Sequence, residues 1–129
     1  MHMLRGMDRV QQWRLSGNVT ILRDALVNAA MANPRMRSAK WDSKSEKLVA
    51  KTRWNFLAFF SVLPQKITAR VDQRTPDFWD VTVCSETLQL LDYGKNAENL
   101  EVFARSICAA GFQLQSTTIR TSWSRRSRP

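Results

Sequence analysis

The residue types that carry most enzyme chemistry are scarce in this sequence, and their spacing assembles no familiar site. The single histidine, His2, has no neighbouring partner for acid–base or metal chemistry. Cys84 and Cys108 lie 24 residues apart, which fits neither a CxxC redox motif nor a zinc knuckle. The three aspartates between positions 72 and 80 surround one expected turn, where short polar side chains form local hydrogen bonds. We therefore expect no catalytic residue, no metal and no cofactor.

Positive charge is the clearest bias in the composition. Among 129 residues, 20 Lys and Arg face 11 Asp and Glu, so the net charge is +9. Residues 1–53 carry +7, residues 54–103 carry −3 and residues 104–129 carry +5. Such a balance favours acidic partners without setting a fold.

Alternation along the expected strands would gather six cations on one sheet face, against only Asp72 and Asp80. These candidate nucleic-acid-binding residues are Arg14, Lys40, Lys51, Arg53, Lys66 and Arg70. A face of this kind can follow a phosphate backbone, and Arg125 and Arg126 near the end of the sequence would add charge. The alternative is the solvated face of an ordinary basic protein, since no nucleic-acid motif or interleaved aromatic residue supports the first interpretation.

The stretch from Trp54 to Pro64 is apolar at eight of its eleven positions, although it lies where a connection between strands would be polar. One interpretation is that it extends a strand and folds back over an open end of the core. The other is an apolar patch for a partner subunit, a second copy or a membrane surface, because monomers seldom leave such patches in water. Its candidate partner-binding residues are Trp54, Phe56, Leu57, Phe59 and Phe60.

Hydrophobic periodicity predicts the elements that position these residues. Residues 10–15 permit a strand, and residues 19–32 have helical spacing after Asn18, a good N-cap, until Asn33-Pro34. Residues 38–41 with 48–52, and 66–72 with 79–84, alternate as two hairpins. A last helix follows Asn96 with an apolar face of Leu100, Phe103, Ile107 and Ala110, and it ends at Gly111.

The order β-α-β-β-β-β-α predicts an α+β fold, a two-layer sandwich with two helices on one face of an antiparallel sheet. Its core would contain the apolar strand residues Trp13, Ala39, Trp41, Leu48, Ala50, Ile67, Ala69, Val71, Trp79, Val81 and Val83. We expect a flexible N-terminus over 1–7, one domain over 8–115 and a disordered basic tail over 116–129.

Two resemblances accompany this prediction. The element order is similar to one repeat of the TATA-box-binding-protein fold, a resemblance of architecture that implies no function. Residues 81–85 and the segment Asp92-Tyr93-Gly94-Lys95-Asn96-Ala97 resemble a bacterial family of unknown function, in which a strand ending in serine leads to Asp-x-Gly-x-Asn-Ala and a terminal helix. The residues of that segment also suit a turn and a helix cap.

The sequence thus predicts a non-enzymatic binding or assembly module with a protein partner or homodimer at residues 54–64, and nucleic-acid binding is the alternative. It contains no stretch long enough to cross a bilayer and no signal-peptide pattern, so we expect a cytoplasmic protein.

Overall fold

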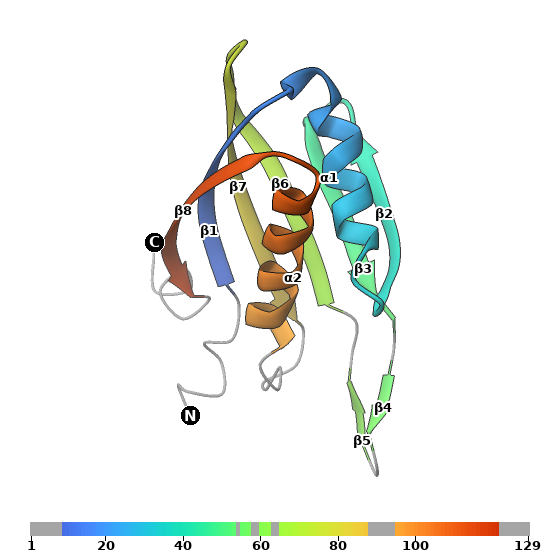
Figure 1. Cartoon of the computed structure of the whole chain (residues 1–129). Coiled ribbons are helices and arrows are strands. Elements are labelled where there is room, and N and C mark those ends of the chain that lie inside the picture. The colour runs from blue at the N-terminus through green and yellow to red at the C-terminus, as the bar shows by residue number, and fades with distance from the viewer. Residues whose placement is uncertain (1–8, 54, 58–59, 63–64, 88–94, 122–129) are drawn as a thin grey trace.

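The computed structural model describes residues 9–53, 55–57, 60–62, 65–87 and 95–121 (Figure 1). In chain order the elements are β1 (Arg9–Ser16), the 3₁₀ turn η2 (Val19–Ile21), α1 (Leu22–Met31), β2 (Met36–Asp42), β3 (Lys47–Thr52), β4 (Asn55–Leu57), β5 (Phe60–Val62), β6 (Gln65–Arg74), β7 (Phe78–Thr87), α2 (Lys95–Ala109) and β8 (Gln113–Thr121). The predicted α+β class is confirmed. The order agrees broadly with the prediction, to which the structure adds β4, β5 and β8.

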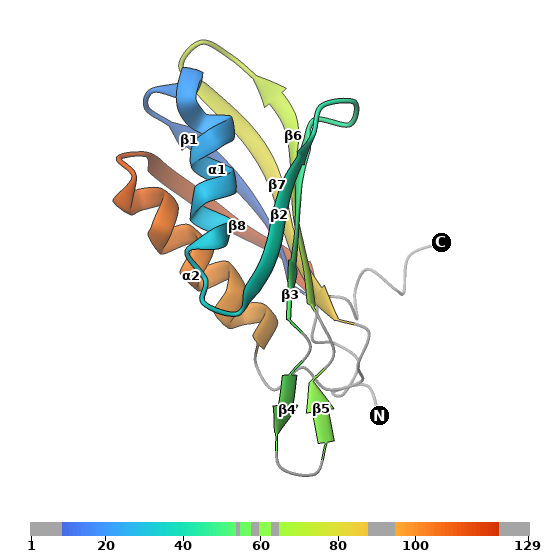
Figure 2. The same ribbon diagram turned by 90° about the vertical axis from the view of Figure 1, so that its right-hand side faces the viewer.

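Six strands form one antiparallel sheet in the order β2-β3-β6-β7-β1-β8. β1 lies between β7 and β8, so the first strand joins elements from the second half of the chain. Both helices cover the same face of this sheet, as the perpendicular view shows (Figure 2). We call the opposite side the outer face.

Period-two alternation decides which strand residues meet the helices, because successive side chains point to opposite faces of a sheet. The predicted core residues that are buried are Trp13, Leu48, Ala50, Ile67, Ala69, Trp79, Val81 and Val83. Ala39, Trp41 and Val71 are partly buried against them. The alternate residues Lys51, Lys66 and Arg70 are exposed.

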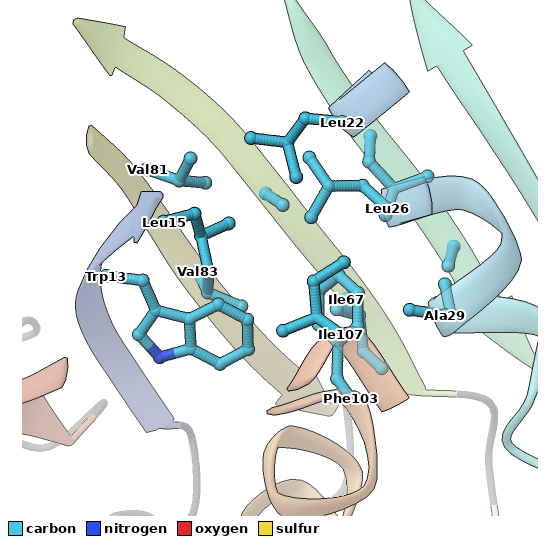
Figure 3. Close-up of a cluster of buried hydrophobic side chains, with 14 of the residues drawn as sticks. Trp13, Leu15, Leu22, Leu26, Ala29, Ile67, Val81, Val83, Phe103 and Ile107 are labelled. Carbon is cyan, nitrogen blue, oxygen red and sulfur yellow. The ribbon is translucent and has the colours of Figure 1, made fainter. Parts of the chain in front are cut away.

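The helices close this core from one side. Leu22 and Leu26 of α1 and Phe103 and Ile107 of α2 point into it (Figure 3). The rings of Phe103 and Trp13 lie 5.2 Å apart between centroids at 50°. A fully buried side chain of this size contributes roughly 1.5–3 kcal/mol to stability, so this contact ties α2 to β1.

Both helix starts differ in detail from the prediction. The turn η2 precedes α1, and the Asn18 side chain caps no backbone N–H there, because its Oδ1 accepts a hydrogen bond from Thr20 Oγ1 at 2.6 Å. α2 already includes Asn96, so the predicted cap lies inside the helix. The predicted end of α2 is confirmed: Gly111 has φ +102°, and its N–H donates to the Cys108 carbonyl at 3.0 Å.

The last strand, β8, crosses the predicted domain boundary at residue 115 and continues to Thr121. It pairs with β1 in the register Leu114 with Leu15 and Thr117 with Gln12. Backbone hydrogen bonds to β1 order a segment whose own side chains have little apolar periodicity. The predicted flexible residues 1–7 and the rest of the predicted tail, with Arg125 and Arg126, lie outside the described residues.

Strands β4 and β5 form a two-stranded sheet of their own, with Phe56 opposite Ser61 and Leu57 opposite Phe60. This β4–β5 hairpin connects the end of β3 to the start of β6. In both views it extends beyond the end of the six-stranded sheet and does not lie over the helices (Figures 1 and 2).

Candidate functional site

The apolar stretch that the sequence singled out therefore coincides with the β4–β5 hairpin. The structure places Phe56 and Leu57 in β4 and Phe60 in β5, and backbone pairing brings these three positions together. Trp54 and Phe59 lie outside the described residues. Within the described part of the chain, neither strand of the hairpin pairs with the main sheet.

Four exposed cations lie at the end of the sheet from which this hairpin extends, and we call them the basic rim: Arg37 near the start of β2, Lys51 near the end of β3, Arg53 just after β3, and Lys66 near the start of β6. Lys51 lies directly opposite Lys66 in the register of β3 and β6. Like charges in directly opposed positions destabilise a sheet. Lys66 approaches Glu86 at 3.8 Å, whereas the other three form no ion pair with another described residue.

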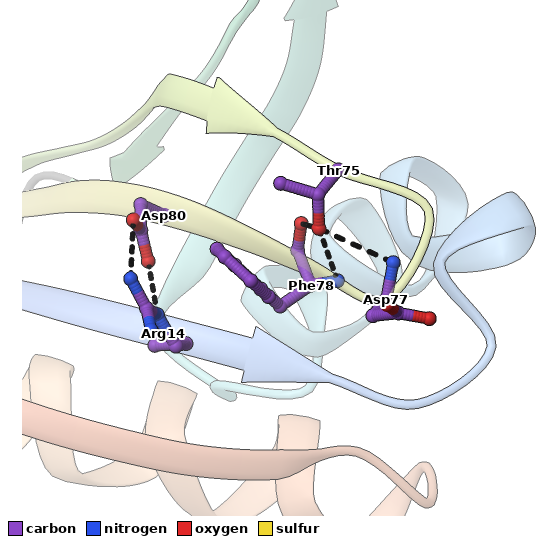
Figure 4. Close-up of polar contacts among 5 residues, drawn as sticks. All are labelled: Arg14, Thr75, Asp77, Phe78 and Asp80. Carbon is purple, nitrogen blue, oxygen red and sulfur yellow. Dashed lines mark hydrogen bonds and ion pairs between the residues drawn. The ribbon is translucent and has the colours of Figure 1, made fainter.

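The far end of the sheet is different, because its arginines pair with carboxylates, although Lys47 there also lies directly opposite Arg70. Arg14 donates two hydrogen bonds to Asp80, at 2.8 Å from Nε and 3.0 Å from Nη2, and its guanidinium lies 4.0 Å from the centroid of the Phe78 ring (Figure 4). These hydrogen bonds, together with the attraction between the charges, hold the pKa of Asp80 below its ordinary value and raise that of Arg14. Arg70 pairs with Asp72 at 3.1 Å.

Neighbouring turns organise this end. Thr75 Oγ1 accepts hydrogen bonds from the N–H groups of Asp77 and Phe78, which closes the β6–β7 turn (Figure 4). In the β2–β3 turn, hydrogen bonds from Ser45 and from the backbone of Lys44 lower the pKa of Asp42. Acidic turn residues are thus concentrated at the end opposite the hairpin.

All six cations predicted for the outer face are exposed, but they divide into two groups. Arg14 and Arg70 are ion-paired, and Lys66 contacts Glu86. Lys40, Lys51 and Arg53 form no ion pair with another described residue. Of these three, Lys51 and Arg53 lie beside the hairpin and Lys40 lies nearer the β2–β3 turn. The ion-paired arginines are therefore at the end opposite the hairpin, which sequence alternation alone does not reveal.

A buried polar cluster, which the sequence analysis missed, lies behind the basic rim on the helix side of the sheet. Asn99 of α2 is fully buried and accepts hydrogen bonds from Asn33 Nδ2 at 3.0 Å and from the Arg35 guanidinium. Its own Nδ2 donates to Gln65 Oε1 at 3.1 Å and to Ser85 Oγ at 3.3 Å. This single amide thus joins α2, the segment after α1, β6 and β7.

Gln65 is the member of this cluster whose side-chain amide is only partly hydrogen-bonded within the described residues. It is 2% exposed, and its backbone N–H donates to Thr52 Oγ1 at 2.8 Å. Its Nε2 has no hydrogen-bond partner in the described part of the chain. An unsatisfied buried donor carries a desolvation cost, so the cluster fixes the geometry of this end of the core at some expense in stability.

A depression of about 440 Å³ lies at the far end of the sheet, and the sequence analysis did not predict it. Trp41 and Trp79 line it with ring centroids 6.5 Å apart, and the guanidinium of Arg74 lies 4.2 Å from the centroid of Trp79. Arg74 also forms an ion pair with Glu46, and Arg23 forms one with Asp24 at 3.5 Å. The four charged residues that line the depression therefore form two ion pairs.

The structure also locates the residues considered for chemistry. Cys84 lies on the outer face of β7 and Cys108 is exposed on α2, so the sheet separates the two thiols and they form no disulfide. Across the described ranges, no group of three or more His, Cys, Asp and Glu is arranged to hold a metal ion. His2 lies outside those ranges.

Neither α1 nor α2 is long and apolar enough to span a bilayer, and this holds for every helix in the described residues. No family model, curated protein or solved structure matches this chain. The resemblances to the bacterial family and to the TATA-box-binding-protein topology stay predictions.

Proposed function

We propose that this chain is a non-enzymatic binding or assembly module whose contact element is the β4–β5 hairpin. The observation that carries the proposal is the separation of this hairpin from the main sheet in backbone pairing and in space. An isolated two-stranded hairpin is marginally stable in water and gains stability by packing against another surface. A sequence as apolar as Asn55–Leu57 and Phe60–Val62 is suited to such packing.

The test replaces hairpin residues and leaves the rest of the domain unchanged. Phe56→Ser combined with Phe60→Ser reduces the apolar character of both strands. Ile21→Ser combined with Met31→Ser is the matched control, because these are large apolar residues of the main domain that are 51% and 45% exposed. Sedimentation velocity at several protein concentrations measures self-association, and retention on a phenyl-substituted resin measures binding to a generic apolar partner.

We expect the wild type and the control pair to be retained on the resin more strongly than the hairpin pair. Self-association, where it occurs, should weaken in the hairpin pair alone. Equal behaviour of all three proteins in both measurements would refute a contact role for the hairpin. Circular dichroism should show the same secondary structure in each protein, because the hairpin pairs only with itself in the described residues.

Sequence-nonspecific nucleic-acid binding is a second candidate, favoured by the direct opposition of Lys51 and Lys66, which an anion would relieve. The logarithm of the affinity for a single-stranded oligonucleotide falls with the logarithm of salt concentration by about 0.7 for each phosphate contacted. If Lys51, Arg53 and Lys66 contact phosphates, the slope should be about −2. An affinity insensitive to salt would exclude this candidate.

We also assign the protein to the cytoplasm. The separation of Cys84 and Cys108 by the sheet is compatible with a reducing compartment, where structural disulfides are rare. Cell fractionation tests this assignment, and recovery of the chain from an oxidising compartment would overturn it.

A further inference from the structure

The end of the molecule that carries the β4–β5 hairpin combines an apolar projection with exposed positive charge. We infer that the partner of this end is the surface of a membrane containing anionic lipids, with the hairpin in the interfacial layer and the basic rim against the lipid phosphates. This inference rests on the proposed function, since it names the partner of the same hairpin.

The dimensions of the hairpin fit an interfacial depth. Each of its strands contains three residues, which at about 3.4 Å per residue span about 10 Å. Interfacial elements enter a bilayer by about 5–10 Å, whereas the hydrocarbon core is about 30 Å thick. The outer edges of β4 and β5 have no partner strand in the described residues. Unpaired backbone groups are tolerated at the hydrated interface and not in hydrocarbon, so the hairpin should lie at the surface without spanning.

The sequence of the hairpin has the composition of an interfacial element. Its strands read Asn-Phe-Leu and Phe-Ser-Val, and eight of the eleven residues from 54 to 64 are apolar. Phe and Leu are among the residues that interfacial elements bury at the boundary between headgroups and acyl chains. No charged residue occurs between Arg53 and Lys66.

Charge complementarity selects an anionic surface over other occupants. Arg37, Lys51, Arg53 and Lys66 are exposed where the hairpin leaves the sheet, and Glu86 is the carboxylate that approaches this rim among the described residues. Anionic headgroups would screen the opposed Lys51 and Lys66. The far end of the sheet has ion-paired arginines and acidic turn residues close to its lysines, so it would attract lipid less than the rim. Attraction therefore orients the hairpin toward the membrane.

A second copy is a poorer occupant. If two hairpins packed against each other symmetrically, each copy would bring its own four rim cations to the interface and no matching set of carboxylates. A membrane provides apolar and anionic groups together, in the layered arrangement that the hairpin and the rim present.

Vesicle flotation with the full chain tests the inference. The probes are vesicles of phosphatidylcholine alone and vesicles of equal parts phosphatidylcholine and phosphatidylserine. Lys51→Gln combined with Arg53→Gln removes two charges from the rim, and Lys44→Gln combined with Lys47→Gln removes two charges from the other end of the β2–β3 hairpin. The third variant is Phe56→Ser combined with Phe60→Ser.

We expect binding to the anionic vesicles and much weaker binding to the neutral ones. Each cation near an anionic membrane increases partitioning roughly fivefold. The rim pair, which is the Lys51→Gln, Arg53→Gln variant, should therefore bind roughly 25-fold more weakly than the wild type. The Lys44→Gln, Lys47→Gln variant should lose much less vesicle binding, because its charges lie farther from the membrane surface than a Debye length of about 8 Å. The hairpin pair should lose most of its binding, and all variants should keep the wild-type thermal unfolding midpoint to within a few degrees.

Three results would overturn the inference. The first is absence of binding to anionic vesicles, and the second is binding that the hairpin pair retains in full. The third is an equal loss of vesicle binding in the rim pair and in the Lys44→Gln, Lys47→Gln variant, which would indicate attraction by net charge alone. If vesicle binding is absent while the hairpin variant still alters resin retention or self-association, the membrane inference fails and the proposed function stands. If vesicles do not bind and a single-stranded oligonucleotide does, with a loss of affinity in the rim and hairpin variants, the partner of this site is nucleic acid and the membrane inference fails.

Discussion

Asn99 provides a sharp test of how the hairpin end of the core is held together. Asn99→Ala removes one amide that bonds to four other residues from separate parts of the chain. The substitution favours the helix itself, because alanine has the highest helix propensity, by roughly 0.5 kcal/mol over asparagine. Any loss of stability must therefore come from the buried partners.

The magnitude follows from what each partner can do after the substitution. Asn33 Nδ2 and Gln65 Oε1 belong to buried residues, and each would lose its hydrogen bond to Asn99. A buried polar group left unsatisfied costs roughly 1–3 kcal/mol. The Arg35 side chain is 21% exposed and can bond to water, and Ser85 has further contacts, so we assign no cost to either. After the helix-propensity gain is subtracted, the expected loss is roughly 2–5 kcal/mol of unfolding free energy.

Equilibrium unfolding in urea, followed by circular dichroism and tryptophan fluorescence, measures this loss. With a slope of about 2 kcal/mol per molar urea, the midpoint should fall by about 1–2.5 M. Asn28→Ala is the matched control, because Asn28 is exposed on α1. The control should change stability by no more than about 0.5 kcal/mol.

Substitution of Gln65 tests the hydrogen bond between Asn99 and Gln65 from the acceptor side. Gln65→Met removes an amide whose Nε2 already lacks a described partner, so it should be much less costly than Asn99→Ala. In the Asn99→Ala background it should be stabilising, because it eliminates the acceptor that the first substitution leaves unpaired. If Asn99→Ala and Asn28→Ala have the same unfolding midpoint, the cluster does not hold this end of the core together.

Three further substitutions test other parts of the fold. Asp80→Asn removes a carboxylate whose pKa the Arg14 hydrogen bonds hold below its ordinary value of 3.8. Because the pKa is lower in the folded state, the carboxylate stabilises the fold above pH 3.8, and this stabilisation is lost as pH falls through the folded-state pKa. The urea midpoints of variant and wild type should therefore converge below about pH 4. Gly17→Ala forces a side chain onto φ +134°, with its Cβ 3.1 Å from Cδ1 of Phe112, and should cost about 1–3 kcal/mol in unfolding free energy; an unchanged value would show that the backbone relaxes there freely. Leu26→Ala creates a cavity under α1, where Leu26 is fully buried. Thermal and urea unfolding should show that the unfolding free energy falls by about 2–5 kcal/mol. A smaller decrease would indicate that the core collapses around the site.

Local periodicity explains why much of the architecture could be predicted. The strand residues from Leu48 to Thr52 and from Ile67 to Val71 alternate because one face of the sheet is covered by helices and the other is not. The spacing of Leu22 and Leu26 reflects the same division around a helix. These signals lie within a few residues of one another, so no knowledge of distant pairing is required.

β8 and the β4–β5 hairpin were missed as strands for different reasons. β8 is ordered by pairing with β1, about 100 residues earlier in the chain, and its Gln, Ser and Thr residues give little apolar alternation. The hairpin has a nearly continuous apolar sequence, in which no period distinguishes a strand from a buried segment. Only the backbone pairing of Leu57 with Phe60 shows where the chain reverses.

By itself, the sequence determined the α+β class, the positions of both helices and the facing of Lys51, Lys66 and the other strand cations, because burial of one face imposes a period that can be read locally. The tertiary structure decided what those residues form together. Asn33, Gln65 and Asn99 each have the sequence context of a turn or surface residue, and only packing brings their amides into one buried cluster. Likewise, the count of charges is a property of composition. The order of strands in the sheet places the basic rim beside the hairpin and the Arg14–Asp80 pair at the other end.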